Sequence, residues 1–245
     1  MNKGLFEASE EGTPQGGPLS PLLSNIMLNE LDKELERRGL PFVRYADDSM
    51  IFCKSKRAAR RVKESITRYI EGTLYLKVNK EKTVVSYVQG VKYLGYSFYV
   101  MKGKCRLTVH PKSKSKMKSR LKELTNRNNG WGYAKRKQKL KEYIRGWIGY
   151  YHLADMKRFL LDIDEWLRRR IRMCIWKSWK KPKTKVANLI KCGIEKYKAW
   201  EWGNTRKGYW RIADSPILKV AINKDSLRKA GYPTLMGSYL EWYPK

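Results

Sequence analysis

Hydrophobic residues in the first hundred positions follow a helical period at two places. Leucine and isoleucine recur at spacings of three and four between Ser20 and Gly39, where Ser20 suits the N-cap, Pro21 the first turn and the glycine the end. The loop at 12–18 that precedes this helix is rich in glycine and proline. A second amphipathic helix is predicted over 56–70. The pattern therefore predicts two helices, each with one buried face.

Shorter apolar runs between and after these helices predict strands. Residues 43–45 and 49–52 are rich in apolar side chains and flank a short polar turn, which is typical of a hairpin. The further strand segments are 74–88, interrupted by a turn at 79–81, then 91–100 and 104–110. This order of helix, hairpin, helix and strands predicts an α+β fold, in which helices cover one face of an antiparallel sheet.

Beyond residue 110 the hydrophobic pattern becomes purely helical. Amphipathic helices are predicted over 110–127, 134–156 and 155–179, and three such helices with short connections should pack as a bundle. Shorter helices are predicted after residue 182. The aromatic residues on the apolar stripes, which are expected in the core rather than on a base-stacking surface, are Trp147, Tyr151 and Trp166.

The charge of the chain is unevenly distributed between these two parts. The formal net charge is +31 over 245 residues. Residues 1–100 contribute 16 basic and 12 acidic side chains, whereas residues 101–245 contribute 38 and 11. All nine tryptophans lie in the second part, which therefore resembles a folded basic module and not a disordered tail. The expected partner is a polyanion such as nucleic acid.

Cysteine usage and hydropathy exclude several classes of protein. The four cysteines form no CxxC pair and only two histidines are present, which argues against a zinc finger or a histidine-rich nuclease site. No apolar run reaches the roughly twenty residues that span a bilayer. We therefore expect a protein of the reducing cytoplasm that has no membrane partner.

Two adjacent carboxylates, Asp47 and Asp48, interrupt the apolar stretch at 42–52. Strands avoid aspartate, whereas turns favour it. One explanation is that both side chains are simply solvated at a hairpin turn, and for an isolated pair this is the more frequent case. The other explanation is a divalent metal site, because Mg²⁺ prefers oxygen ligands and stabilises the attacking and leaving oxygens in phosphoryl transfer.

Two groups in the helical part contain more basic residues than a solvent-exposed helix face requires for solubility, and neither group contains an acidic residue. They suit contacts with an RNA backbone, in which each neutralised phosphate makes binding more sensitive to salt. The residues expected to bind RNA are Lys112, Lys114, Lys116 and Lys118 in the first group and Lys135, Arg136, Lys137 and Lys139 in the second.

Four short motifs occur in an order and at spacings that resemble a known family. They are PQGGPLSPLLSN at 14–25, YADD at 45–48, VNKEKT at 78–83 and KYLGY at 92–96. Together they resemble the later palm motifs of reverse transcriptases encoded by bacterial group II introns. The basic segment that follows, with GWIGYY at 146–151 and LRRRIRMCIWKSWKK at 167–181, resembles the thumb of these enzymes, also called the maturase domain. The resemblance implies a partial palm over 1–110 and a thumb and maturase domain over 111–245.

The resemblance also implies roles in RNA-directed DNA synthesis, with Mg²⁺ as cofactor. Asp47 is implied as the principal metal ligand and Asp48 as its neighbour, while Lys82 would lie near the phosphates of an incoming dNTP. An ordinary surface lysine on a turn explains Lys82 equally well. The residues implied to contact nucleotide, template or primer are Gln15, Gly16, Gly17, Tyr45, Ala46, Leu94, Gly95 and Tyr96. The implied partners are group II intron RNA, an RNA template with a DNA primer, and dNTPs.

The sequence departs from the family pattern in one respect. The family's palm has a further metal-binding aspartate on a strand well upstream of the PQGG loop, preceded by the fingers, whereas only eleven residues precede Gly12 here. The sequence therefore resembles the C-terminal part of such an enzyme. We expect negligible polymerase activity from this chain alone, because two carboxylates position a metal less well than three. The alternative function is that of a non-catalytic fragment that binds RNA and assists splicing. Further partners that stay open are a second polypeptide that supplies the other half and a second copy of this chain.

Overall fold

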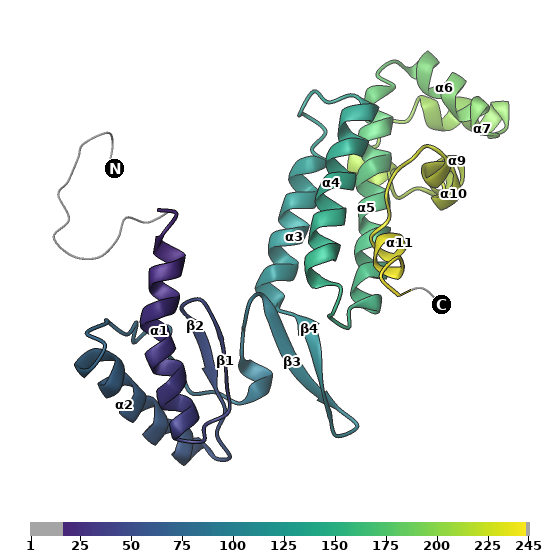
Figure 1. Ribbon diagram of the computed structural model, residues 1–245. Helices are drawn as coiled ribbons and strands as arrows, with labels where there is room; N and C mark the ends of the chain where they lie inside the picture. The colour runs from purple at the N-terminus through teal and green to yellow at the C-terminus, as the bar shows by residue number, and fades with distance from the viewer. Residues whose placement is uncertain (1–16, 244–245) are drawn as a thin grey trace. The chain divides into compact units, whose positions relative to one another are not determined.

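The computed structural model describes residues 17–243, which form two compact units that divide between Tyr87 and Val88 (Figure 1). Residues 88–110, which the resemblance assigns to the palm, belong to the second compact unit. The functional division between residues 110 and 111 stays a prediction.

The first unit combines two helices with one hairpin. Its elements are α1 (Ser20–Arg37), β1 (Phe42–Tyr45), β2 (Asp48–Ile51) and α2 (Lys56–Gly72). Strands β1 and β2 pair antiparallel, with Phe42 opposite Ile51 and Tyr45 opposite Asp48, so that only two residues form the loop between them. The predicted hairpin and both predicted helices are confirmed.

The two helices of the first unit begin differently. The Ser55 hydroxyl caps α2 by accepting a hydrogen bond from the backbone N–H of Ala58 at 3.1 Å. The predicted cap of α1 is wrong, because its N-cap is Leu19, which makes no side-chain capping bond, and Ser20 is already helical. Pro21 lies in the first turn as expected, where its missing N–H would have no intrahelical acceptor.

The core of the first unit is small. Among the described residues of this unit, the buried hydrophobic side chains are Leu31, Leu35, Ile66 and Leu74. By contrast, apolar side chains that recur one turn apart along the N-cap and the N-terminal half of α1 are exposed. They are Leu19, Leu22, Leu23, Ile26 and Met27. Helix α1 therefore buries one end of its apolar face against α2 and the hairpin and exposes the other.

Residues 74–88 do not form the predicted strands. The segment is irregular and mostly exposed, and strands require a neighbouring strand to satisfy their backbone groups. The turn at 79–81 is confirmed, because the N–H of Lys82 donates to the Asn79 side chain and the N–H of Thr83 donates to the Asn79 carbonyl, both at 3.0 Å. Local turn chemistry was thus readable from the sequence, whereas strand pairing was not.

The second unit joins a hairpin to a helical bundle (Figure 1). Its elements are η1 (Val88–Gly90), β3 (Tyr96–Met101), β4 (Lys104–Val109), α3 (Pro111–Leu124), α4 (Tyr133–Tyr151), α5 (Lys157–Ser178), α6 (Pro182–Lys191), α7 (Lys196–Gly203), α8 (Tyr209–Ile212), α9 (Pro216–Ala221), α10 (Lys224–Lys229) and α11 (Leu235–Leu240). Strands β3 and β4 pair antiparallel, with Tyr96 opposite Val109. The three long helices predicted from the sequence are confirmed as α3, α4 and α5.

The strand predicted over 91–100 begins later than expected. Its first half is a tight turn, in which the backbones of Tyr93 and Tyr96 exchange hydrogen bonds of 3.1 and 2.8 Å. Between them, Leu94 and Gly95 have φ values of 49° and 80°. Positive φ at both central residues is typical of a two-residue reversal. The chain therefore turns here before it enters β3.

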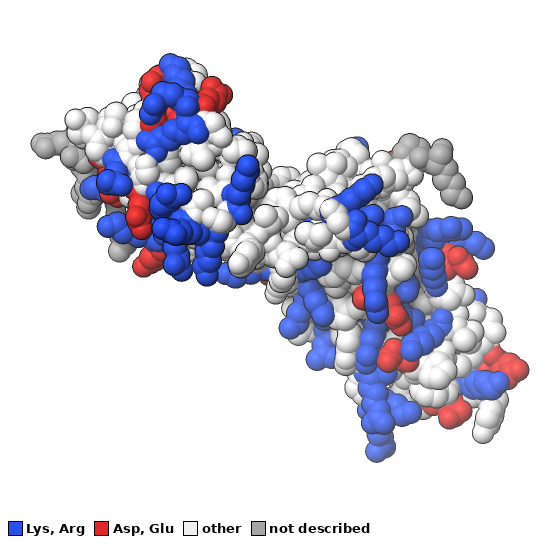
Figure 2. Space-filling view, turned by 90° about the horizontal axis from the view of Figure 1, so that it is seen from below, with Lys and Arg blue, Asp and Glu red and all other residues white. Residues whose placement is uncertain are grey.

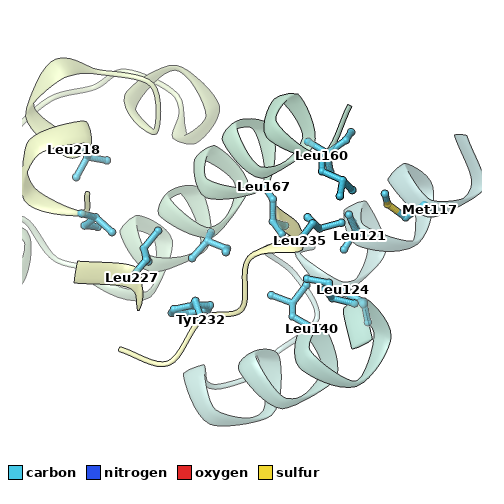
Figure 3. Close-up of a cluster of buried hydrophobic side chains, with 14 of the residues drawn as sticks. Met117, Leu121, Leu124, Leu140, Leu160, Leu167, Leu218, Leu227, Tyr232 and Leu235 are labelled. Carbon is cyan, nitrogen blue, oxygen red and sulfur yellow. The ribbon is translucent and has the colours of Figure 1, made fainter. Parts of the chain in front are cut away.

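One large core fills the second unit. Twenty-five buried hydrophobic side chains form a single cluster, in which leucines of α3, α4 and α5 meet residues of the short C-terminal helices (Figure 3). As predicted, Trp147, Tyr151 and Trp166 pack against this core. The buried carboxylate of Asp164 in α5 accepts hydrogen bonds from the N–H groups of Leu235 and Met236 at 2.8 and 2.9 Å. This carboxylate therefore satisfies two donors at the start of α11.

The strands of residues 17–243 form two separate two-stranded sheets instead of one larger sheet. With both hairpins accompanied by helices, the predicted α+β class is confirmed. None of the helices described between residues 17 and 243 is both long enough and apolar enough to cross a lipid bilayer.

Candidate functional site

The side chains of Asp47 and Asp48 lie at the tip of the β1–β2 hairpin. Asp47 is in the two-residue loop, Asp48 opens β2 opposite Tyr45, and both side chains are exposed. The other loop residue, Ala46, has a φ of 52°, which lies in the left-handed region that costs a non-glycine residue roughly 1 kcal/mol. A strained two-residue turn therefore carries Asp47, and Asp48 follows it at the first position of β2.

Arg44 fixes this hairpin to α1. Its guanidinium pairs with the Asp32 carboxylate, with 2.5 Å between Nη2 and Oδ2 and 2.8 Å between Nε and Oδ1. It also donates to the side-chain oxygen of Asn25 and to the carbonyl of Ala46, at 3.0 Å each. The bond to Ala46 connects the strained loop itself to α1. These hydrogen bonds of Arg44 therefore stabilise the conformation of the tip.

An open depression adjoins the acidic tip. The residues that line it are Pro21, Asn25 and Asp32 of α1 and Phe42, Arg44, Tyr45 and Ala46 of the hairpin. Tyr45 is 64% exposed at this place. The depression thus offers an aromatic ring and several hydrogen-bonding groups beside the two carboxylates.

The donor set at the tip fits a divalent cation in part. Asp47 and Asp48 supply hard oxygen ligands of the kind that Mg²⁺ takes. Within residues 17–243, however, no three His, Cys, Asp or Glu side chains converge on one metal position. Asp32 is engaged by Arg44. A cation at the tip would therefore need water or phosphate oxygens as its remaining ligands.

The palm motifs also imply roles for residues outside this hairpin. Gln15 and Gly16 are outside the described part of the chain, and Gly17 is its first residue, just before α1. Lys82 is exposed on the turn that Asn79 closes. The roles implied for these residues stay predictions.

The KYLGY turn belongs to the second unit and not to the unit that carries the carboxylates. The Leu94 carbonyl accepts a hydrogen bond from the Tyr150 hydroxyl of α4 at 3.0 Å. Burial raises the pKa of Tyr96 to about 12, with a smaller contribution from Tyr150. Motif order groups Leu94, Gly95 and Tyr96 with the carboxylates, whereas packing groups them with α4.

The basic residues predicted to bind RNA differ in what they contact. The exposed members are Lys112, Lys116, Lys118, Lys135 and Lys139. Lys139 is paired with Glu142 at 2.9 Å. Lys114 is half-buried over the ring of Phe159, and this burial lowers its pKa. On the face of the second unit seen in Figure 2, Lys and Arg side chains outnumber Asp and Glu.

The placement of Arg136 does not fit a contact with RNA phosphates. Arg136 is buried, and its Nη2 donates to the side-chain oxygen of Asn129 at 3.0 Å. The ammonium of Lys137 donates to the Ala230 carbonyl at 2.8 Å. Arg136 lies four residues before the buried Leu140 and so shares its core-facing side of α4. The basic run was predicted to form one surface, but its helical phase places Arg136 on the core-facing side of α4.

Arg44 and its partners Asp32 and Asn25 were not predicted from the sequence. A usable signal was present, because Arg44 alternates with Val43 and Tyr45 and therefore faces the same side of the strand as the core residue Phe42. An inward-facing arginine requires a charged or polar partner. Which helix supplies that partner was decided by the packing of α1 on the hairpin.

Comparison with known proteins gives two family matches, which follow each other along the chain. Residues 2–98 match reverse transcriptase (RNA-dependent DNA polymerase), and residues 114–193 match the group II intron maturase-specific domain. The first match contains the hairpin with Asp47 and Asp48, and the second contains α4 and α5. The two matches occur in the order that the sequence motifs predicted.

Several curated proteins are similar to parts of this chain. Protein YkfC of Escherichia coli (strain K12) is 34% identical over 39% of this chain and 34% of its own length. Group II intron-encoded protein LtrA of Lactococcus lactis subsp. cremoris is 27% identical over 39% of this chain and 27% of its own length. Retron Mx65 reverse transcriptase of Myxococcus xanthus is 39% identical over 29% of this chain and 17% of its own length.

The chain spans about a third or less of the length of these curated relatives. Its two family matches nevertheless combine a polymerase region with a maturase region in one polypeptide. The chain therefore contains a region that matches reverse transcriptase, followed by a region that matches the group II intron maturase-specific domain, and part of it is similar to a group II intron-encoded protein.

Proposed function

We propose that this chain carries part of a DNA polymerase site at the tip of the β1–β2 hairpin and an RNA-binding surface on α3 and α4. The observation that carries the proposal is the exposure of two consecutive carboxylates at the hairpin tip, Asp47 in the loop and Asp48 at the start of β2, within the region that matches reverse transcriptase. A solvated hairpin would explain the carboxylates alone. It would not explain why Arg44 anchors the turn that carries them.

In this proposal Asp47 and Asp48 hold Mg²⁺, which when bound supplies charge stabilisation for the attacking and leaving oxygens of nucleotidyl transfer. Arg44 keeps the tip in position through Asp32 and the Ala46 carbonyl. Tyr45 presents its ring beside the depression, where a base or sugar of the primer end could pack. Lys82 is the proposed partner of the dNTP phosphates.

The proposed RNA-binding surface is formed by exposed lysines of the second unit. These are Lys112, Lys116 and Lys118 on α3 and Lys135 on α4. Such side chains would contact phosphates of group II intron RNA or of a primer–template duplex. Phosphate contacts set the affinity and its salt dependence, but they carry no sequence information of their own.

A second candidate function is RNA binding without chemistry. It is favoured because the tip is an incomplete metal site: the described residues offer two carboxylates there and no third. The second unit also has a large core of its own, so it could recognise intron RNA and assist splicing whether or not the tip is active. The two functions differ in whether Asp47 is required, because DNA synthesis at the tip would need this carboxylate and RNA binding by the second unit would not.

Metal binding at the tip separates these functions without an activity assay. Mn²⁺, which substitutes for Mg²⁺ at oxygen sites, can be titrated into the purified chain and followed by electron paramagnetic resonance. We expect Asp47→Asn to weaken binding about tenfold, because it removes one of two charged ligands. Glu64→Gln, which removes an exposed carboxylate from α2, is the matched control. Equal affinities for all three proteins would contradict the proposed metal site.

Primer extension on an RNA template tests the polymerase directly. We expect negligible synthesis from this chain alone, because the described residues present only two metal-binding carboxylates at the tip. Processive cDNA synthesis by the purified chain would contradict this expectation. Loss of that synthesis in Asp47→Asn would then assign the reaction to the tip.

Salt titration tests the RNA-binding surface. Replacing Lys112, Lys116 and Lys118 with glutamine should weaken binding of a structured intron RNA. It should also reduce the slope of log affinity against log salt by roughly 0.7–0.9 for each phosphate that the protein no longer neutralises. Lys137→Gln is the control, because its ammonium is engaged by the Ala230 carbonyl. An unchanged slope in the triple variant would remove these lysines from the interface.

A further inference from the structure

The Leu94–Gly95 turn is held by donors that come from outside the turn. The Tyr150 hydroxyl donates to the Leu94 carbonyl at 3.0 Å. The Ser113 hydroxyl and the His110 N–H donate to the Gly95 carbonyl at 3.1 and 3.0 Å. Because Ser113 lies on α3 and Tyr150 on α4, both carbonyls of the turn are fixed by the helical bundle.

The backbone of this turn needs such support. Leu94 has a φ of 49°, a left-handed conformation in which the Cβ of leucine crowds the following carbonyl. Residues in this region persist only where their surroundings determine the conformation. The bond from Tyr150 to Leu94 therefore stabilises a turn that a leucine would not adopt by preference.

Aromatic packing fixes the same turn from a second direction. The Tyr96 hydroxyl donates to the backbone carbonyl of Tyr150, and the rings of Tyr96 and Tyr151 lie 5.2 Å apart between centroids. The Tyr151 ring also packs on Trp147 at 4.6 Å. The Tyr151 hydroxyl occupies the space that a Cβ on Gly95 would need. The turn thus fits against α4 so closely that a side chain at its second position would have to displace the Tyr151 hydroxyl.

The hairpin that follows the turn is fastened to the helices at another point. The N–H of Asp155, in the connection between α4 and α5, donates to the Leu107 carbonyl of β4 at 2.8 Å. The Asp155 carboxylate accepts from the Tyr99 hydroxyl of β3 at 2.6 Å. With two separate attachments, the β3–β4 hairpin and its leading turn cannot rotate against α4 without breaking several bonds.

We propose that Tyr150 and Tyr151 are positioning residues for the primer strand. They fix the Leu94–Gly95 turn to α4, so that the turn and the helical bundle contact a primer–template duplex as a single rigid unit. The inference rests on the proposed function, since only the resemblance links this turn to the primer. Its physical advantage is a fixed spacing between the turn and the lysines of α3 and α4, which removes the ordering cost of two loosely joined contacts.

Amide hydrogen exchange tests whether Tyr150 fixes the Leu94–Gly95 turn to α4, and this test needs no nucleic acid. Tyr150→Phe removes the hydroxyl that bonds to Leu94 and keeps the ring. We expect the amides of Tyr96 and His110 to exchange about fivefold faster, as for the loss of one neutral hydrogen bond. Tyr133→Phe is the matched control, because this exposed tyrosine at the other end of α4 loses a hydroxyl bonded to Ser178. Unchanged exchange rates in Tyr150→Phe, or the same change in the control, would contradict the proposal that Tyr150 fixes this turn to α4.

Nucleic-acid binding by the 245-residue chain tests the primer role. We would compare an RNA template carrying a DNA primer with a recessed 3′ end against the single-stranded RNA template, both followed by fluorescence anisotropy. We expect Tyr150→Phe to weaken the duplex complex about fivefold and the single-strand complex less than twofold. Equal effects on both, or none on the duplex, would overturn the inference alone. A wild-type chain that binds neither nucleic acid would instead contradict the proposed function as well.

A double-mutant cycle tests the close fit at Gly95. Gly95→Ala should weaken duplex binding about tenfold, because the new methyl group meets the Tyr151 hydroxyl and the backbone φ of 80° disfavours alanine. In the Tyr151→Phe background the hydroxyl is gone, and we expect the same change to cost about threefold. Equal penalties in both backgrounds would show that the Tyr151 hydroxyl does not hold the turn.

Discussion

The two units of the chain are stabilised in different ways. The first unit has four buried hydrophobic side chains among its described residues, and half of the apolar face of α1 is exposed. The second unit has a continuous core of twenty-five buried side chains. The residues proposed for chemistry lie on the first unit, and those proposed to bind RNA lie on the second. A small core leaves the position of the acidic tip to polar anchors such as Arg44, whereas the bundle is positioned by apolar packing.

The largest difference is expected when each core loses one leucine. Leu35 and Leu140 are both fully buried, and truncation to alanine costs about 2–5 kcal/mol at such sites. We expect Leu35→Ala to abolish hydrogen-exchange protection in α1 and α2, because it removes one of four core residues. Leu140→Ala should lower the stability of the second unit but leave it folded.

Tryptophan fluorescence and hydrogen exchange report these two outcomes separately. All nine tryptophans lie in residues 131–242, so the fluorescence transition monitors the second unit alone. It should be unchanged in Leu35→Ala. A shifted fluorescence transition in that variant would show that the two cores are coupled, and the comparison of independent units would be wrong.

A smaller loss is expected when the second unit loses a buried polar contact. Asp164→Ala leaves the N–H groups of Leu235 and Met236 without acceptors, and we expect a decrease of about 3 kcal/mol in the unfolding free energy. Asp162→Ala removes an exposed carboxylate from the same helix and should change it by less than about 0.5 kcal/mol. Urea unfolding followed by fluorescence measures both. Equal effects would mean that apolar packing alone docks α11.

Tyr232 provides a test with the opposite sign. Its buried hydroxyl has no hydrogen-bond partner, so Tyr232→Phe should raise the stability of the second unit by about 1 kcal/mol at pH 7. Burial also raises the pKa of Tyr232 to about 12, above the value near 10 of an unfolded chain. Folding therefore favours the neutral hydroxyl. The part of the unfolding free energy that arises from this pKa difference is complete below pH 10 and is lost as the pH rises through 12.

The pH dependence distinguishes this explanation from a simple packing effect. The unfolding free energy of the wild-type chain should fall between pH 10 and 12, and that of Tyr232→Phe should fall less. Parallel curves for the two proteins would show that another group, such as Tyr96, dominates the alkaline transition.

The smallest expected effect concerns the acidic tip. Ala46→Gly relieves the positive φ of 52° and should stabilise the first unit by about 0.5–1 kcal/mol, measured by hydrogen exchange of the β1–β2 amides. Ala134→Gly, at an exposed position of α4, should instead destabilise its own unit by a similar amount. Destabilisation in both variants would mean that the Arg44 network, and not backbone strain, sets the conformation of the tip.

Local patterns in the sequence were sufficient for most of the elements. The period of apolar residues predicted α1, α2 and the three long helices of the second unit, and the polar turn between two apolar runs predicted the β1–β2 hairpin with its carboxylates. They were insufficient where a residue's partner lies far along the chain. The strands expected over 74–88 found no partner, and Arg136 was read as a surface residue although its helical phase faces the core.

The sequence by itself determined the helical periods, the turn that carries Asp47 and Asp48, and the charge difference between the two parts, because each depends on residues that are close neighbours in the chain. Only the tertiary structure decided that Arg44 anchors the acidic tip and that the Leu94–Gly95 turn belongs with α4. Those contacts join residues 12 to 56 positions apart. Such pairs are selected by the packing of whole elements, which no local pattern encodes.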